Sequence, residues 1–231
     1  MLHKTRGIVL NFIKYRETSI VTRIYTEEFG LQSYIVNGVR GSNKKSKSKI
    51  SFFQPLTLLD LVVYYKKTAG LNRISEIKCL EPYQSIPYNF RKSSIALFIT
   101  EVLNKCLKEE EGNTPQFEFL RYSLQMFDHL EEHYENFHLQ LMLKFSRYLG
   151  FAPASADDVF DEVYEFVGKP TISEQEQQVL NLLLQNPYTS PVKTTNATRR
   201  FLLDDLIKYY QMHVGGFGEL KSLVVLREVL E

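Results

Sequence analysis

The sequence has no tryptophan and two cysteines, and it lacks a long apolar run. Cys79 and Cys106 stand far apart, and two thiols can build neither a disulfide framework nor a four-cysteine zinc site. Asn11 and Lys14 interrupt the apolar stretch near the N-terminus, unlike the core of a signal peptide. No apolar segment approaches the roughly 20 residues that a membrane helix needs. We therefore expect a soluble, cytoplasmic protein without a membrane partner.

Catalytic and metal-binding motifs are also missing. His129 and His133 lie four residues apart, but a zinc site needs three or four ligands, and only His138 is near them in sequence. The GGFG at 215–218 lacks the Lys-Ser/Thr of a P-loop and does not follow a strand, so a turn between helices explains it better. We expect no enzymatic activity, no metal, no cofactor and no small-molecule substrate.

The formal net charge of +1 hides a strong asymmetry. Residues 1–80 contain 14 Lys and Arg against 5 Asp and Glu, a net charge of +9. Residues 81–231 contain 14 Lys and Arg against 22 Asp and Glu, a net charge of −8. A basic front half joined to an acidic back half is expected when only the front half binds a polyanion.

The basic half has the pattern of a small β-barrel. Short runs rich in Ile, Val, Tyr, Phe and Thr alternate with turn signals from residue 5 to about residue 82. The expected strands span 7–15, 20–26, 31–37, 56–65 and 72–80. In the fourth, alternation predicts one apolar face of Leu59, Leu61, Val63 and Tyr65, with Asp60, Val62 and Tyr64 on the other face. Five short, mostly antiparallel strands favour a closed barrel of the OB type, because closure removes exposed edges. We assign 1–80 to this nucleic-acid-binding domain, in a two-domain α+β protein.

The acidic half, 81–231, has helical periodicity. Apolar residues recur at spacings of three and four, and about six helices are expected. Thr114 with Pro115 predicts one helix start, Gly150 predicts one helix end, and Ser173 with Glu176 predicts a capping box. The segment 151–170 is acidic and is expected to be irregular. We assign this all-α domain to protein interactions.

The loop at 36–50 carries five cations on a Gly/Ser/Asn-rich backbone, and no Asp or Glu occurs between Glu28 and Asp60. Flexible cations suit a phosphate backbone, which requires charge without fixed geometry. We expect DNA contacts from Arg40, Lys44, Lys45, Lys47 and Lys49, extended by Lys66, Lys67 and Arg73. The alternative is a solvated loop whose lysines only keep the protein soluble.

Tyrosines on the expected strands are candidates for stacking on bases. Tyr25, Tyr34 and Tyr64 stand among basic residues, and Arg23 shares a strand face with Tyr25. Aromatic rings beside cations are typical of proteins that bind single-stranded nucleic acid. The alternative is that these tyrosines fill or rim the barrel core, because aromatic residues favour strands in any case.

The order of several segments resembles the RecO family of bacterial DNA repair proteins over nearly the whole chain. The matching segments are TRGIVLNFIKYRETSIVTRIYTEEFGLQSYIVNGVR, QPLTLLDLVVYY, RISEIKCLEP, RYLGFAP and RRFLLDDLIKYYQMHVGGFGELKSLVVL. The resemblance implies an OB-fold followed by a helical domain. It also implies a nucleoid-associated mediator that binds single- and double-stranded DNA and anneals complementary strands. Such a mediator works with RecR to help RecA replace the single-strand-binding protein SSB.

One departure from the family concerns zinc. Many RecO proteins carry a four-cysteine zinc module after the segment matching RYLGF, whereas FAPASADDVFDEVYEFVGKP contains no cysteine. The chain is therefore similar to a zinc-less member, and other contacts must stabilise this segment.

The family's SSB partner ends in an acidic tail with a terminal aromatic residue, which needs an apolar pocket beside a cation. Candidates in the helical domain are Lys144, Arg147, Arg199 and Arg200, with ordinary surface cations as the alternative. A rival function is an RNA-binding or ribosome-associated OB protein, because stacking and phosphate contacts serve both nucleic acids. A nucleic-acid hydrolase would need a carboxylate cluster, and none is suggested.

Overall fold

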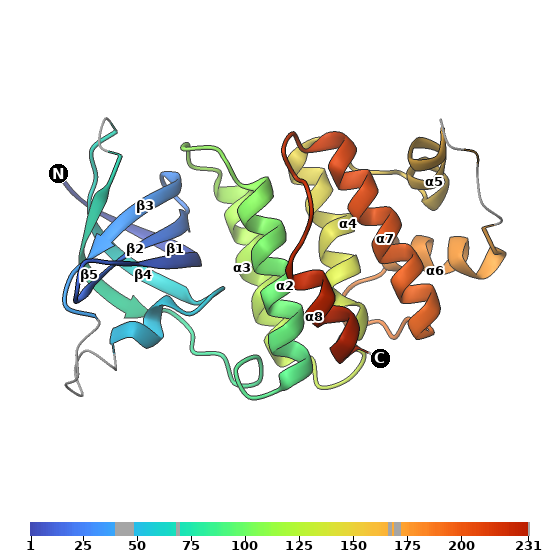
Figure 1. Ribbon diagram of the computed structural model, residues 1–231, viewed down its shortest axis with the longest axis horizontal. Coiled ribbons are helices and arrows are strands. Elements are labelled where there is room, and N and C mark those ends of the chain that lie inside the picture. The colour runs from blue at the N-terminus through green and yellow to red at the C-terminus, as the bar shows by residue number, and fades with distance from the viewer. Residues whose placement is uncertain (40–48, 68–69, 166–167, 169–171, 231) are drawn as a thin grey trace. The chain divides into compact units, whose positions relative to one another are not determined.

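The computed structural model describes residues 1–39, 49–67, 70–165, 168 and 172–230. The chain forms two compact units (Figure 1). The barrel unit contains Met1–Gln84 and Thr100–Leu124, and the helical unit contains Ser85–Ile99 and Gln125–Glu231. Neither unit is a single stretch of chain, because a central helix pair contributes to both.

Five strands close into a barrel in the order β1-β2-β3-β5-β4 (Figure 1). All neighbouring pairs are antiparallel except β3 with β5, which is parallel. This closed five-stranded arrangement confirms the predicted OB-type barrel. The strands are β1 Leu2–Tyr15, β2 Ser19–Thr26, β3 Gly30–Val36, β4 Leu58–Tyr64 and β5 Asn72–Cys79.

Alternation of side chains builds the barrel core. On β4, Leu59, Leu61 and Val63 are buried in the barrel's hydrophobic cluster, whereas Asp60 and Tyr64 are exposed, as the sequence pattern predicts. β1 begins five residues earlier than expected and pairs with both β2 and β4. The register of its pairing with β2 shifts between Val9 and Asn11, and such a bulge bends a strand.

The turn between β2 and β3 packs closely against the segment before α3 (Thr114–His129). Leu31 N donates a hydrogen bond to Glu109 O at 2.8 Å. A Cβ at Gly112 would lie 2.4 Å from Glu28 O, so only glycine fits this approach. These contacts fix the strands that precede the basic loop.

The described residues contain seven α-helices, one more than expected. Gly150 ends α4 in the left-handed conformation at φ 87°, and Ser173 with Glu176 forms the predicted capping box of α6. The helices are α2 Phe90–Cys106, α3 Thr114–His129, α4 Phe137–Leu149, α5 Ala156–Tyr164, α6 Glu174–Gln185, α7 Asn196–His213 and α8 Ser222–Val229. Two 3-10 turns, η1 Ser51–Phe53 and η2 Tyr134–Asn136, complete the described elements.

Helix α5 lies in the segment that was expected to be irregular, so that prediction was wrong. Ser155 and Asp158 form a capping box at its start. Val159 and Phe160 are buried, and the Tyr164 hydroxyl donates to Asp205 of α7 at 2.6 Å. Apolar packing and hydrogen bonds thus stabilise this cysteine-free segment.

Candidate nucleic-acid interface

An exposed aromatic–cation pair lies on the outer face of the barrel. Tyr64 on β4 and Arg73 on β5 are directly opposite each other in the antiparallel ladder. Tyr64 is 53% exposed, and Arg73 is also exposed. Asn72 accepts a hydrogen bond from Lys66 N at 3.0 Å, which fixes the end of the hairpin. An exposed ring beside a cation is the combination with which proteins bind single-stranded nucleic acid.

Lys66 and Lys67 follow β4 at this hairpin, and both are exposed. The Lys67 ammonium lies 3.8 Å from Glu111, and the two side chains are 81% and 82% exposed. Solvent and salt weaken such an ion pair, so it does not prevent Lys67 from binding a phosphate. We call Tyr64, Lys66, Lys67 and Arg73 the hairpin cluster.

The basic loop supplies the second set of cations. Arg40, Lys44, Lys45 and Lys47 lie outside the described residues. Lys49 lies two residues before η1 and is exposed.

The chain leading into the loop is held at the β1–β2 turn, where Val39 N donates to Thr18 O at 3.0 Å. Lys14 and Arg16 are exposed at this turn. Neither was predicted from the sequence, although the short polar turn between the first two expected strands could have indicated them.

Lys14 and Arg16 lie near one end of β1, and the hairpin cluster lies near the other. The loop entrance contacts the turn after Tyr15, whereas the hairpin cluster lies beside the N-terminus, where Tyr65 N donates to Met1 O at 3.3 Å. A straight strand of this length would span on the order of 45 Å. In Figure 1 the β4–β5 hairpin and the turn η1 likewise lie at different edges of the barrel. The extension of the loop's cations by Lys66, Lys67 and Arg73 stays a prediction, because Arg40, Lys44, Lys45 and Lys47 lie outside the described residues.

Two of the tyrosines considered for stacking are buried. Tyr34 is 0% exposed and belongs to the barrel core. Tyr25 is 2% exposed, and its hydroxyl donates to Gln116 at 2.9 Å beneath α3. Neither ring is accessible to a base in this structure. Arg23 is half-buried on β2, opposite Asn11 and Ser33.

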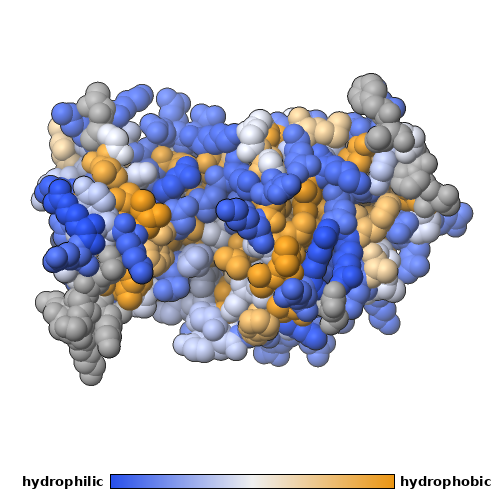
Figure 2. Space-filling model, viewed as in Figure 1, coloured by the Kyte–Doolittle hydropathy of each residue, from blue (hydrophilic) through white to orange (hydrophobic). Residues whose placement is uncertain are grey.

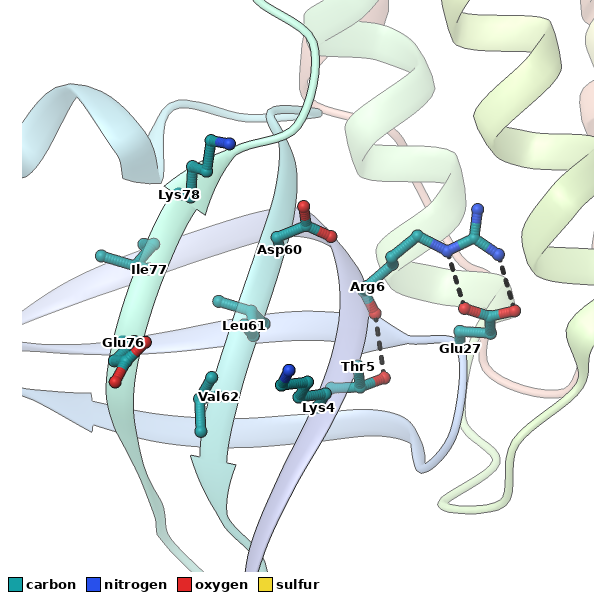
Figure 3. Close-up of a pocket in the computed structure, with 10 residues that line it drawn as sticks. All are labelled: Lys4, Thr5, Arg6, Glu27, Asp60, Leu61, Val62, Glu76, Ile77 and Lys78. Atoms are coloured by element: carbon teal, nitrogen blue, oxygen red, sulfur yellow. Dashed lines mark hydrogen bonds and ion pairs between the residues drawn. The ribbon is translucent and has the colours of Figure 1, made fainter.

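A cavity of about 530 Å³ opens on the outer face of β1, β4 and β5 (Figure 3). Arg6 donates two hydrogen bonds to Glu27, at 2.7 and 2.8 Å, and a third to Glu118. Three cations and three carboxylates line the cavity, so its formal charge is zero. A phosphate would therefore gain little electrostatic free energy by binding in this cavity. The lining residues are Lys4, Thr5, Arg6, Glu27, Asp60, Leu61, Val62, Glu76, Ile77 and Lys78.

In the helical unit, Lys144 has a structural role. Its ammonium donates to Leu184 O in the last turn of α6 at 3.1 Å, and burial lowers its pKa. A cation at this position complements the partial negative charge of a helix C-terminus. Arg147 is exposed, so of this candidate pair it is the more accessible to a partner.

Arg199 is also held by the protein itself. Its guanidinium donates to Asn136 at 3.0 Å, to Asn196 at 2.8 Å and to Thr194 at 3.0 Å. Arg200 is half-buried. The structure thus separates these two neighbouring candidates into an anchored residue and a more accessible one.

Within the described ranges, no group of three or more His, Cys, Asp or Glu is placed to hold a metal ion. In the same residues, no helix combines the length and apolar character that crossing a membrane requires. Figure 2 shows hydrophilic side chains over much of both units, interrupted by smaller apolar areas.

Comparison with known proteins gives two family matches that together cover most of the chain. Residues 1–83 match the family "Recombination protein O N terminal", and residues 87–223 match "Recombination protein O C terminal". A "DNA repair protein RecO" of Flavobacterium psychrophilum is 38% identical over 98% of both chains. Proteins of the same description from Phocaeicola vulgatus and Bacteroides fragilis are 35% identical, over 99% and 100% of both chains.

Proposed function

The chain belongs to the RecO family of DNA repair and recombination proteins, and from this we propose that it is a recombination mediator. It binds single- and double-stranded DNA and anneals complementary strands. With RecR, it helps RecA to replace SSB on single-stranded DNA. It acts in the cytoplasm at the nucleoid and catalyses no covalent step. The two family matches over both halves of the chain carry this proposal.

The charge distribution supports DNA binding by the barrel unit. Residues 1–80 have a net charge of +9, and the described cations of the hairpin cluster and of the β1–β2 turn are exposed. Exposed lysines and arginines can displace the counterions of a phosphate backbone, which gives affinity without sequence preference. Tyr64 adds a ring on which any base can stack.

Strand annealing follows from the same features. Two complementary strands repel each other through their phosphates, and bound cations reduce that repulsion. Contacts to phosphates leave the hydrogen-bonding edges of the bases free to pair. A shallow basic surface would therefore promote annealing without reading the sequence.

The protein partners are proposed for the helical unit, whose acidic composition suits DNA less well. Arg147 and Arg200 are our preferred candidates for the acidic tail of SSB, because each is more exposed than its neighbouring candidate, Lys144 or Arg199. Glu substitutions at Arg147 and at Arg200, tested separately with a labelled tail peptide, would show which cation contributes.

Annealing of two labelled complementary oligonucleotides tests the proposal. We expect the variant with Lys44, Lys45, Lys47 and Lys49 changed to Gln to anneal more slowly than the parent. A second variant, Lys66→Gln with Lys67→Gln and Arg73→Gln, compares the hairpin cluster. If both variants bind and anneal as well as the parent, the proposed DNA surface is wrong. Binding of RNA in clear preference to DNA of the same sequence would favour the RNA-binding alternative.

A further inference from the structure

A polar cavity of about 520 Å³ lies within the helical unit. Its walls come from the first turn of α2, from η2, from the segment that leads into α7, from the first turn of α7 and from the residue after α8. This volume falls in the range of about 300–1,000 Å³ that is typical of ligand sites. The lining residues are Arg91, His133, Glu135, Asn136, Val192, Lys193, Thr194, Asn196, Arg199 and Leu230.

Positive charge predominates in this lining, although the surrounding half of the chain is acidic. Arg91, Lys193 and Arg199 face a single carboxylate, Glu135, so the formal charge of the lining is +2 with His neutral. Burial lowers the pKa of Arg199, Glu135 opposes that shift, and the like charge of Arg91 adds to it. An anion placed between the two guanidinium groups would relieve their repulsion.

Arg199 is oriented for such a ligand. The side-chain oxygens of Asn136, Thr194 and Asn196 accept hydrogen bonds from three of its five N–H groups. These bonds fix the plane of the guanidinium. Two N–H groups remain to bind an oxyanion, and a fixed guanidinium loses little entropy on doing so. Arg91 and Lys193 are exposed, and neither forms a salt bridge within the part of the chain that the structure describes.

Two aromatic rings stand exposed directly before Arg91. Tyr88 is 84% exposed, and Phe90, the first residue of α2, is 72% exposed. Exposed rings next to cations form a stacking platform for bases. An acidic peptide with an aromatic end fits less well, because the cavity walls are mostly polar and offer Val192 and Leu230 as their apolar side chains.

We propose that this cavity and the two rings form a second binding site for a single nucleic-acid strand. Arg91, Lys193 and Arg199 bind its phosphates, and Tyr88 with Phe90 stacks on its bases. This inference rests on the proposed function. It gives each molecule two strand sites, one in the barrel unit and one in the helical unit, so that a single protein can hold both strands that are to be annealed.

The test counts the strands bound per full-length protein, by native mass spectrometry with an oligo-dT of about 15 nucleotides. The cavity variant carries Arg91→Gln and Lys193→Gln, and the ring variant carries Tyr88→Ala and Phe90→Ala. All four side chains are exposed, so folding should be kept. The matched control is Lys108→Gln with Lys221→Gln, two exposed cations that line none of the cavities described above.

We expect the parent and the control to bind two strands, and the cavity variant to bind its second strand so weakly that protein with one strand predominates. For the second strand, the slope of log K against log salt should be smaller by about 1.4 in the cavity variant than in the parent, because two phosphate contacts are lost at about 0.7 each. In the ring variant, the affinity for the second strand should fall by about 5- to 150-fold, because the stacking contacts are lost. The loop variant with four Lys→Gln changes should keep the cavity site.

Two strands on the cavity variant, as on the control, would overturn the second site and leave the proposed function standing. Failure of the parent to bind any strand would instead overturn the proposed function. An acidic peptide could also bind the parent at Arg91 and Lys193 without displacing a strand. That result would mean that no strand occupies the cavity and that the site belongs to a protein partner, so the inference would be wrong.

Discussion

Tyr64 lies opposite Arg73 on the outer face of the barrel, with more than half of its surface exposed. We expect Tyr64→Ala to weaken binding of single-stranded DNA by about 1–3 kcal/mol, because a stacking partner for one base is lost. Fluorescence anisotropy with a labelled oligonucleotide measures the change. Tyr34→Phe is the control, because Tyr34 is buried in the barrel core and should not alter the affinity. Equal effects of both substitutions would contradict base stacking at Tyr64.

His138 on α4 makes stability depend on pH. The side chain is fully buried, and burial together with the charge of Arg199 lowers its pKa from 6.5 to about 3. Between these two values the unfolded chain binds a proton that the folded protein does not. Stability therefore falls as the pH is lowered through 6.5. We expect a loss of about 2 kcal/mol from His138 between pH 7 and pH 5.

Urea unfolding at several pH values measures this loss. His138→Leu should remove most of the pH dependence in that window, whereas His129→Gln, at an exposed position, should retain it. An unchanged pH profile for His138→Leu would show that other groups cause the effect.

At the same scale, the sequence predicted which side chains of a strand share a face, but it did not predict what covers that face. The alternation of Leu59, Leu61 and Val63 with exposed residues was predicted correctly. Tyr25 was also considered for base stacking, but Gln116, 91 residues later in the chain, lies against its hydroxyl. Such contacts depend on the tertiary fold, which cannot be inferred from the periodicity of apolar residues along one strand.

At the scale of elements, the close approach between the β2–β3 turn and the segment before α3 depends on Gly112. We expect Gly112→Ala to lower the free energy of unfolding by about 1–3 kcal/mol, because the new Cβ would lie 2.4 Å from Glu28 O. Gly70→Ala is the matched control, because its Cβ would meet nothing within 4 Å. Equal stability of both variants in urea unfolding would contradict this close packing.

Helix α5 shows why one element was missed. Its nine residues are too few for a clear helical repeat, and five of them are Asp, Glu or Tyr on the polar side. The pattern of Ser155 followed by Asp158 was the available local signal. The same kind of signal at Ser173 and Glu176 was recognised because a longer apolar repeat follows it.

At the scale of the whole molecule, charge and composition predicted a basic barrel and a helical remainder. They did not predict that Lys14 and Arg16 lie near one end of β1 and the hairpin cluster near the other, since that separation follows from strand register. They also did not predict the positive cavity in an acidic half, because its three cations come from two segments about 100 residues apart.

Equilibrium binding of single-stranded DNA across a salt series tests most directly whether the basic loop forms the DNA site. The parent is compared with the variant in which Lys44, Lys45, Lys47 and Lys49 are changed to Gln. Four phosphate contacts at about 0.7 each predict that the slope of log K against log salt falls by roughly 3. An unchanged slope would contradict the account and leave the loop as a solubilising connection.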